Sequence, residues 1–236
     1  MPNCLSYDPT FSYELAVIVH DGLRRMYAEQ EDVYYYITVM NENYEHPAMP
    51  EGAEANILKG MYKFRDGEKS KGPRVQLLGS GTIFREVIAA ADLLKNDWGV
   101  DADIWGCPSF NQLARDGQDA ARWNLLHPLD TPRVSHVETC LKGAAGPVIA
   151  ATDYVKLFSE QIRPFVPGRY VTLGTDGYGR SDTREALRNH FEVDRRWVAV
   201  AALKALADEG SIDREKVREA IVKYGIDADK PNPLTV

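Results

Sequence analysis

The residues "RVQLLGSGTIFREVIAAADLLKNDW" (74–98) place an apolar, strand-like run directly before a helix-like run, with two glycines between them. The first part, residues 74–81, has the length and composition of a buried β-strand. The second part, residues 82–98, carries apolar side chains at helical spacing, namely Ile83, Val87, Ala90, Ala91 and Leu94. A strand that turns at glycine into an amphipathic helix is the building unit of an α/β sheet.

The same alternation continues to the end of the chain. We predict strands over residues 61–64, 74–81, 100–107, 147–153 and 169–177, and helices over 52–59, 82–98, 109–124, 154–166, 182–191, 194–208 and 213–224. We expect residues 65–72 to form a polar hairpin loop and Gly117 to disturb its helix. Strands that alternate with helices of this length predict a mostly parallel sheet with helices on both faces.

The first fifty residues follow a different pattern. A helix is predicted over 11–28, capped by Asp8 or Thr10, and an apolar strand over 33–40. The proline-containing segment 41–54 then has the composition of a linker. A strand buried on both faces needs neighbours, so this strand either joins the following sheet or belongs with sequence upstream of Met1. We favour upstream sequence, because the linker is typical of a domain boundary.

Composition narrows the class of protein. The 236 residues are 44% hydrophobic and 27% charged, with a formal net charge of −7. The negative charge argues against nucleic acid and against anionic membrane surfaces as partners. No apolar run is long enough to span a membrane, and the N-terminus lacks the pattern of a signal peptide. Cys4, Cys107 and Cys140 form no CxxC pair, which predicts reduced thiols and a cytoplasmic location.

Two glycine-rich stretches are candidates for phosphate-binding loops. "GSGTIF" (79–84) has Phe84 where a dinucleotide fingerprint has its third glycine, and Asp103 lies inside the next strand rather than at its tip. A tight turn between strand and helix is therefore the favoured interpretation, and a nucleotide-binding oxidoreductase is disfavoured.

The second stretch is "GTDGYGRSDTREALRNHFEVD" (174–194). No Lys-Ser or Lys-Thr follows its glycines, and Asp176 would repel a phosphate, so we do not interpret it as a phosphate cradle. Asp182 with Glu185, or Ser181, is expected to cap the following helix. Arg180, Arg184 and Arg188 are expected to pair with acids of a neighbouring domain or subunit.

Polar residues gather just beyond the predicted strand 33–40. Asn41, Glu42, Asn43 and His46 lie where open α/β sheets place ligands, so they are candidates for lining a site. A histidine metal site is not expected, because His20, His46, His127, His136 and His190 do not have the spacing of metal ligands.

Several long segments carry a family resemblance. They are "YYYITVMNENYEHPAMPEGAE" (34–54), "QLLGSGTIFREVIAAADLL" (76–94), "SFNQLARDGQDAARWNLLHP" (109–128), "ATDYVKLFSEQIRPFVP" (151–167) and "LGTDGYGRSDTREALRNHFEVD" (173–194). In order and spacing they resemble the carboxyl-terminal part of the homodimeric type of pyruvate dehydrogenase component. The resemblance covers essentially the whole chain.

The resemblance implies a fold and a division of the chain. Residues 1–45 correspond to the last helix and strand of the middle, pyrimidine-binding domain plus a linker. Residues 46–236 correspond to a transketolase-like C-terminal domain, a three-layer α/β/α structure with a mostly parallel sheet.

The resemblance also implies the parent reaction and its components. Family members use thiamine diphosphate and magnesium to decarboxylate pyruvate, and they pass the acetyl group to the lipoyl group of dihydrolipoyl acetyltransferase. The implied partners are the remainder of the parent chain, the second subunit of a homodimer and the acetyltransferase.

No catalytic residue can be transferred to this chain from the family. The GDG…N pattern that binds diphosphate and metal is absent, and the other active-site groups lie in segments upstream of Met1. We therefore expect the chain alone to bind neither cofactor nor metal and to be inactive. The remaining candidate site residues are Asn41, Glu42, Asn43 and His46, which are expected to form part of the wall at the entrance of the parent active site. At the position of Glu42, related transketolases have an arginine that holds sugar phosphate. Glu42 is therefore expected either to exclude phosphorylated sugars or to be an ordinary solvated residue of the linker. The alternative function for the chain as a whole is a non-catalytic interaction or dimerisation module built from the same domain.

Overall fold

The computed structural model describes residues 1–68 and 72–236. Its main sheet has the order β3-β5-β4-β6-β7, with β3 antiparallel to β5 and the other pairs parallel. The strands are β3 (Tyr62–Arg65), β4 (Arg74–Gly79), β5 (Asp101–Gly106), β6 (Val148–Ala151) and β7 (Tyr170–Leu173). Each of them falls within or close to a predicted strand. The mostly parallel sheet is therefore confirmed.

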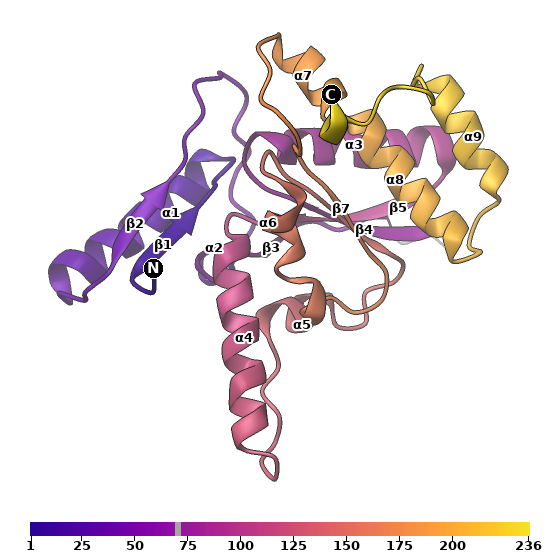
Figure 1. Ribbon diagram of the computed structural model, residues 1–236. Coiled ribbons are helices and arrows are strands. Elements are labelled where there is room, and N and C mark those ends of the chain that lie inside the picture. Colours follow the sequence, from indigo (N-terminus) through magenta and orange to yellow (C-terminus); the bar gives the residue numbers. More distant parts are fainter. Residues whose placement is uncertain (69–71) are drawn as a thin grey trace.

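Helices cover both faces of this sheet (Figure 1). One face carries α3 (Phe84–Trp98), α8 (Arg195–Asp208) and α9 (Arg214–Lys223), and the other carries α4 (Phe110–Leu126), α5 (His136–Leu141) and α6 (Lys156–Glu160). Successive residues of β4 point to opposite faces, so Leu77 joins the core under α3 while Leu78 joins the core under α4. The three-layer α/β/α arrangement was predicted, except that α5 was missed.

The connections between strands create a switch point at the carboxyl edge of the sheet. The chain leaves β4, passes through a 3₁₀ turn at Gly81–Ile83 and α3, and enters β5 on one side. It then passes through α4 and crosses to β6 on the other side of β4. Because the loops after β4 and β6 diverge to opposite faces, a crevice opens between them.

The N-terminal segment forms a small separate sheet. Strand β1 (Cys4–Tyr7) pairs in parallel with β2 (Tyr34–Ile37), and α1 (Ser12–Leu23) extends into a π-helical turn at Arg24–Ala28. As favoured from the sequence, the strand predicted over 33–40, which is β2, does not join the main sheet. β1 was not predicted, and the expectation of a strand buried on both faces was wrong, since Tyr34 and Tyr36 of β2 are exposed.

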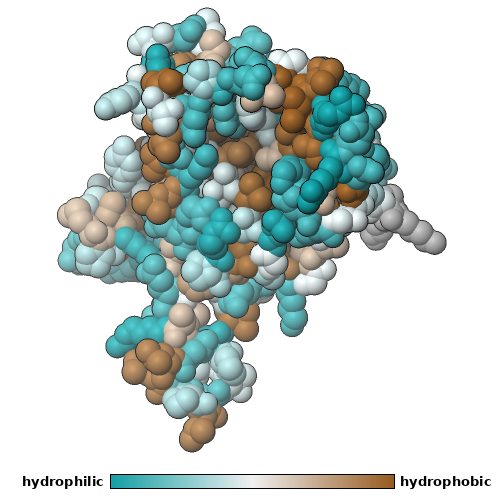
Figure 2. Space-filling view, turned by 45° about the vertical axis from the view of Figure 1, so that its right-hand side comes forward, coloured by the Kyte–Doolittle hydropathy of each residue, from teal (hydrophilic) through white to brown (hydrophobic). Residues whose placement is uncertain are grey.

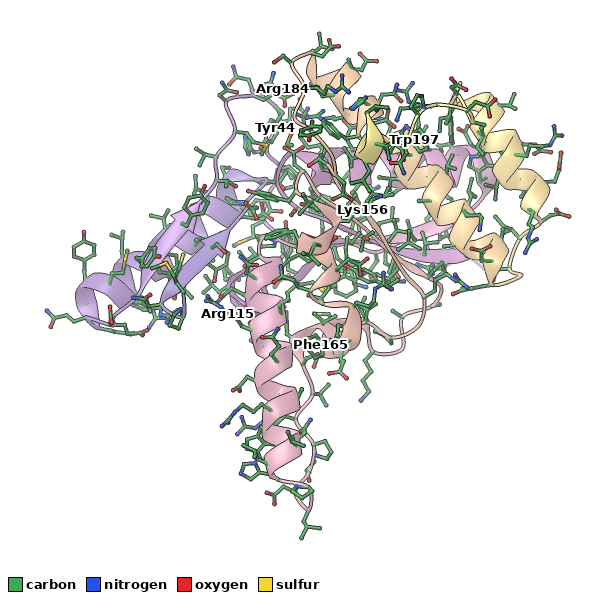
Figure 3. The ribbon with its side chains drawn as sticks, viewed as in Figure 1. Tyr44, Arg115, Lys156, Phe165, Arg184 and Trp197 are labelled. Atoms are coloured by element: carbon green, nitrogen blue, oxygen red, sulfur yellow. The ribbon has the colours of Figure 1, made fainter. Side chains whose placement is uncertain are left out.

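The small sheet is nevertheless fastened to the main domain. Phe11 is buried in the core beside Phe64 and Phe84, with ring centroids 5.6 and 5.9 Å away. Arg115 of α4 donates to the carbonyl of Cys4 at 2.8 Å, and Ser109 donates to the carbonyl of Ser6 at 2.6 Å. Figure 3 labels Arg115 at the root of α4. These bonds occupy carbonyls on the outer edge of β1.

Some local predictions were wrong for identifiable reasons. Neither Asp8 nor Thr10 caps α1: the N-cap residue is Phe11, and the carboxylate of Glu14 in the first turn accepts from the backbone N–H groups of Thr10 and Phe11 just before the helix. Thr183, rather than Asp182 or Ser181, caps α7 (Arg184–His190) by accepting from the N–H of Ala186. The loop at 65–72 does not join a hairpin, because β5 lies between β3 and β4. Residues 69–71 of that prediction lie outside the described residues.

Helix α4 continues beyond the body of the protein as an arm (Figure 1). It is not interrupted at Gly117, contrary to prediction. The tip of the arm, at the bottom of Figure 2, gathers hydrophobic residues, among them the exposed Leu125, Leu126 and Leu129. No helix within the described ranges is long and apolar enough to cross a membrane.

Candidate functional site

A cavity opens at the carboxyl edge of the main sheet, close to the switch point between β4 and β6. Its volume is about 310 Å³. Its walls come from the loops after β4, β6 and β7 and from α7. The lining residues are Thr82, Asp153, Thr175, Gly177, Gly179, Arg180, Arg184, Leu187, Arg188, Phe191 and Val193. We call this cavity the arginine cleft.

The loop after β7 forms one wall because its glycines permit a tight course. Gly177 has φ +104°, and a Cβ there would lie 2.3 Å from the carbonyl oxygen of Pro233 in the C-terminal segment. Asp176 does not line the cleft: its carboxylate accepts from the N–H of Lys156 at 3.1 Å and lies 3.8 Å from the Lys156 ammonium. The repulsive carboxylate expected in this loop is thus paired with Lys156 outside the lining.

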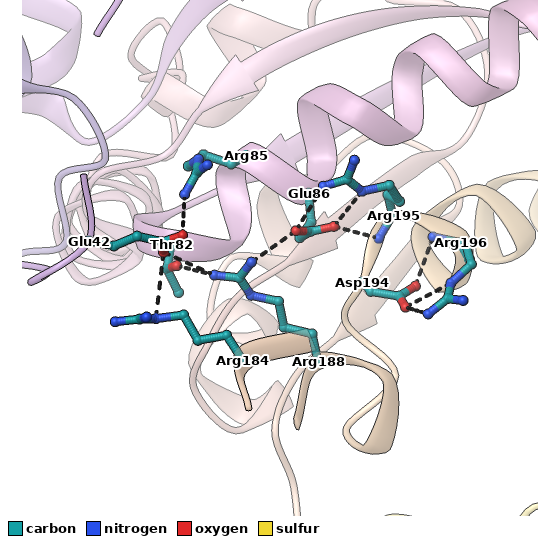
Figure 4. Close-up of polar contacts among 9 residues, drawn as sticks. All are labelled: Glu42, Thr82, Arg85, Glu86, Arg184, Arg188, Asp194, Arg195 and Arg196. Atoms are coloured by element: carbon teal, nitrogen blue, oxygen red, sulfur yellow. Dashed lines mark hydrogen bonds and ion pairs between the residues drawn. The ribbon is translucent and has the colours of Figure 1, made fainter. Parts of the chain in front are cut away.

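The linker carries Glu42 to the outer side of the same arginines (Figure 4). The Glu42 carboxylate lies 2.9 Å from the guanidinium of Arg85, and 3.6 Å from those of Arg184 and Arg188. Arg184 also donates to the side-chain oxygen of Asn41 at 2.9 Å. Arg184 and Arg188, which were expected to pair with acids of a neighbouring domain or subunit, thus lie beside an acid of the linker in the same chain.

The other two predicted residues lie apart from this cluster. Asn43 is exposed. The Nδ1 atom of His46 accepts from the N–H of Ser12 at 2.9 Å, and its ring stacks on Tyr44 with centroids 4.6 Å apart. The guanidinium of Arg85 lies over the other partner of that stack, 4.3 Å from the Tyr44 ring. The structure therefore brings Asn41 and Glu42 to the arginines, whereas His46 fastens the linker to the start of α1.

A buried carboxylate supports the arginine cleft from behind. Glu86 of α3 lies 3.0 Å from Arg188 and 2.8 Å from Arg195, and Arg188 also donates to the hydroxyl of Thr82 at 2.7 Å. Burial raises the pKa of Glu86, but the bonds from Arg195 and the charge of Arg188 outweigh it and hold that pKa below its usual value. Glu42 behaves alike: burial opposes ionisation, yet Arg85, Arg188 and Arg184 together lower its pKa. Both acids are thus anionic at neutral pH.

A second, smaller cavity of about 190 Å³ adjoins the arginine cleft, sharing Thr82 and Asp153 as lining. In it, Asp8 accepts from the hydroxyls of Thr38 and Tyr154, both at 2.7 Å. Burial raises the pKa of Asp8 and also that of Asp153. No local sequence pattern points to Asp8, Asp153 or Tyr154 as site residues, because the segments that carry them meet only in the folded chain.

The turn at "GSGTIF" serves packing. A Cβ on Gly79 would lie 2.8 Å from the Phe84 ring and 2.9 Å from Val87, so glycine lets α3 approach β4 closely. Asp103 accepts from Arg74 at 2.8 Å and from Gln76 at 2.9 Å inside the fold. These contacts support the interpretation as a tight turn.

The residues present do not fit a diphosphate–magnesium site. Within residues 1–68 and 72–236, no group of three His, Cys, Asp or Glu side chains could hold a metal ion. Glu42 and Glu86, which lie beside the arginine cleft, are themselves held by arginines, which leaves them poor ligands for a cation. We therefore derive no chemical step through such a cofactor on this chain.

Comparison with known proteins places these features in context. Residues 60–194 match the model of the transketolase-like C-terminal domain, and residues 1–47 match that of the pyruvate dehydrogenase E1 component middle domain. The chain is 74% identical to the pyruvate dehydrogenase E1 component of Cupriavidus necator over 100% of its length, and 60% identical to that of Escherichia coli K12 over 99%. It spans 26% of each of these relatives.

Solved structures agree on the fold. Transketolase from Campylobacter jejuni superposes with a TM-score of 0.59 at 17% identity, over 86% of this chain and 26% of that chain. A structure described as a split gene transketolase, an inactive beta4 tetramer, superposes with a TM-score of 0.52 at 17% identity, over 88% of this chain and 58% of that chain.

Proposed function

The chain belongs to the family of transketolase-like C-terminal domains, and from this premise we propose that it forms the C-terminal quarter of a pyruvate dehydrogenase E1 component. In this proposal the parent enzyme decarboxylates pyruvate with thiamine diphosphate and magnesium. It passes the acetyl group to the lipoyl group of dihydrolipoyl acetyltransferase. The observation that carries the proposal is the 74% identity across the full length of the chain to an enzyme of that name.

We assign different origins to the two parts of the chain. Residues 1–45 are the last part of the middle domain with a linker, and residues 46–236 are the C-terminal domain. The separate sheet β1–β2 supports this division, because a two-stranded sheet is too small to be stable by itself. In the parent enzyme, the remainder of the middle domain would supply its further neighbours.

We propose that the chain alone does not turn over pyruvate. The lack of fit to a diphosphate–magnesium site supports this, as does the absence of a GDG…N pattern. The cofactor and the catalytic groups would then be held by other parts of the parent chain and by the second subunit of a homodimer. The free thiols of Cys4, Cys107 and Cys140 suit the cytoplasm as the location.

The linker is proposed to form part of the entrance wall of the parent active site. Three arginines hold Glu42 in place, so its carboxylate has a defined position rather than that of a mobile surface group. A fixed negative charge there would repel phosphorylated sugars and leave pyruvate unaffected in comparison. Asn41, bonded to Arg184, would share this wall, with Asn43 and His46 at its margin.

An interaction module is a second candidate function. The exposed Leu125, Leu126 and Leu129 at the tip of the arm favour it, since apolar groups gathered on a projecting element mark contact surfaces. A contact role and the role as part of the parent enzyme are compatible.

A chimera tests the main proposal. The last quarter of the Cupriavidus necator enzyme is replaced by this chain, and pyruvate-dependent acetyl transfer is measured with both cofactors. We expect activity within severalfold of the parent. A chimera that folds and dimerises yet does not react contradicts the assignment, and turnover by the 236-residue chain alone contradicts the proposed inactivity of the fragment.

A further inference from the structure

We propose that the arginine cleft is a binding site for a small oxyanion, a phosphate or carboxylate group carried on a compact body. The site is formed by residues of this chain alone, and binding there does not depend on the parent reaction.

The position of the cleft is the first argument. It lies at the carboxyl ends of β4, β6 and β7, next to the point where the connections diverge to opposite faces of the sheet. Open α/β sheets bind ligands at this place because diverging loops leave a crevice that no helix fills. Thr82 from the first loop and Asp153 from the second lie in the lining, so the cavity is built from both sides of the switch point.

The charge of the lining is the second argument. Three arginines, Arg180, Arg184 and Arg188, face one carboxylate, Asp153. Within the described part of the chain Arg180 makes no ion pair or hydrogen bond, although it stands at the cleft. Arg184 reaches Glu42 only at 3.6 Å, longer than a direct charge-assisted bond. The cleft therefore offers guanidinium groups with donor capacity left for an anion.

The rear arginine is fixed for this role. Arg188 is held by Glu86 at 3.0 Å and by Thr82 at 2.7 Å, and only 14% of its side chain is exposed. A guanidinium positioned by other groups loses little freedom when it binds, which favours binding over a mobile surface arginine. Because the Thr82 hydroxyl accepts from Arg188, its own proton stays available to donate to the ligand.

The remaining wall and the size restrict the ligand. Leu187, Phe191 and Val193 form an apolar side. A volume of about 310 Å³ is at the lower end of small-molecule sites, and it suits a ligand of few heavy atoms. The expected ligand therefore directs a single oxyanion toward the arginines and a compact apolar part toward Leu187 and Phe191.

The test titrates the ¹⁵N-labelled 236-residue chain at constant ionic strength, with inorganic phosphate in one series and pyruvate in another. Amide shifts of Gly177 and Gly179 locate binding. We expect saturable chemical-shift changes with at least one of the two probes. The probe that binds with the lower Kd shows whether the site prefers a phosphate or a carboxylate. Arg180→Gln should weaken binding about five- to tenfold, the loss of one charge-assisted contact. Arg218→Gln, which changes an exposed arginine of α9, should leave it unchanged.

Glu42→Gln provides the opposite test, since removing the competing carboxylate frees Arg184 and Arg188 and should tighten binding severalfold. The proposal is overturned if neither probe gives saturable shifts at these glycines. It is equally overturned if Arg180→Gln and Arg218→Gln affect binding alike. Because the experiment needs no thiamine chemistry, its failure would leave the proposed pyruvate dehydrogenase assignment untouched.

Discussion

The carboxylate of Glu42 lies 2.9 Å from the guanidinium of Arg85, and this contact joins the linker to the first turn of α3. Arg85 in turn lies over the ring of Tyr44, two residues further along the linker. One arginine therefore holds the linker both by charge and by its planar face.

Replacing Arg85 by Met should release the linker while keeping the aliphatic stem. We expect faster amide hydrogen exchange over residues 41–46 and unchanged protection in β5, because only the linker loses its contact. The paired variant Arg218→Met changes an exposed ion pair of α9 and should leave the linker unaffected. Equal exchange in wild type and Arg85→Met would mean that Tyr44 and His46 hold the linker without Arg85.

The parts of the fold that depend on local periodicity could be predicted from the sequence, and the parts that depend on distant contacts could not. Alternating strands and helices follow from local periodicity, so the main sheet and most of its helices were predictable from residues such as Leu77, Leu78 and Val87. Gly117 was expected to disturb α4, but the helix is unbroken there. The ring of Phe165, nearly fifty residues further along the chain, occupies the space that a Cβ at this position would need. Likewise β1 pairs with β2 across some thirty residues, and its short sequence "CLSY" has too little pattern to reveal it.

The candidate site was predictable only in part. Asn41 and Glu42 could be identified because they follow a strand, whereas Arg180, Arg184 and Arg188 were predicted only to pair with acids of a neighbouring domain or subunit. The contacts between these two groups could not be anticipated. They depend on how the linker crosses α3, which local sequence does not encode.

Gly117→Ala should destabilise the protein, although alanine ordinarily stabilises a helix by about 1 kcal/mol relative to glycine. A Cβ at this position would lie 2.3 Å from the ring of Phe165, which is labelled in Figure 3. We expect a net loss of about 1–3 kcal/mol in the free energy of unfolding, measured with urea. In a Phe165→Leu background the same substitution should cost far less. If it costs the same in both backgrounds, the contact with Phe165 is not its cause.

Stability should fall as the pH rises, through Glu14. This carboxylate is almost fully buried, and burial raises its pKa to about 7 from an ordinary 4.5, against the opposing bonds from the N–H groups of Phe11 and Thr10. Between these two values the native state keeps a proton that the unfolded chain releases. The free energy of unfolding therefore falls by roughly 3 kcal/mol as the pH rises from 4.5 toward 7.

Glu14→Gln removes this titration while keeping an acceptor oxygen for the start of α1. We expect the variant to gain stability over the wild type at pH 8 and to lose that advantage at pH 5, as measured by urea unfolding. A difference between the two proteins that stays constant from pH 5 to pH 8 would show that Glu14 titrates normally.

The open face of β2 should cause the chain to self-associate. Tyr35 points toward α1, where its hydroxyl bonds to Asp21, whereas Tyr36 points away from that helix and is 61% exposed. The root of α4 covers the neighbouring strand β1 on this side, through the bond from Asn111 to Ser6, but it does not cover Tyr36. β2 also has only β1 beside it among the described strands, which leaves an unpaired edge. Both features indicate a surface that another chain or domain covers.

Tyr36→Lys should therefore shift the chain from oligomer toward monomer in sedimentation velocity, without loss of folding, because the side chain is exposed. The matched control is Leu129→Lys at the tip of the arm, which is 99% exposed and lies on a different element. This control should leave the oligomer intact, since a charge at the arm does not touch the small sheet. If instead Leu129→Lys dissociates the oligomer and Tyr36→Lys does not, association runs through the arm. A wild-type chain that is monomeric at tens of micromolar would show that neither surface suffices for self-association.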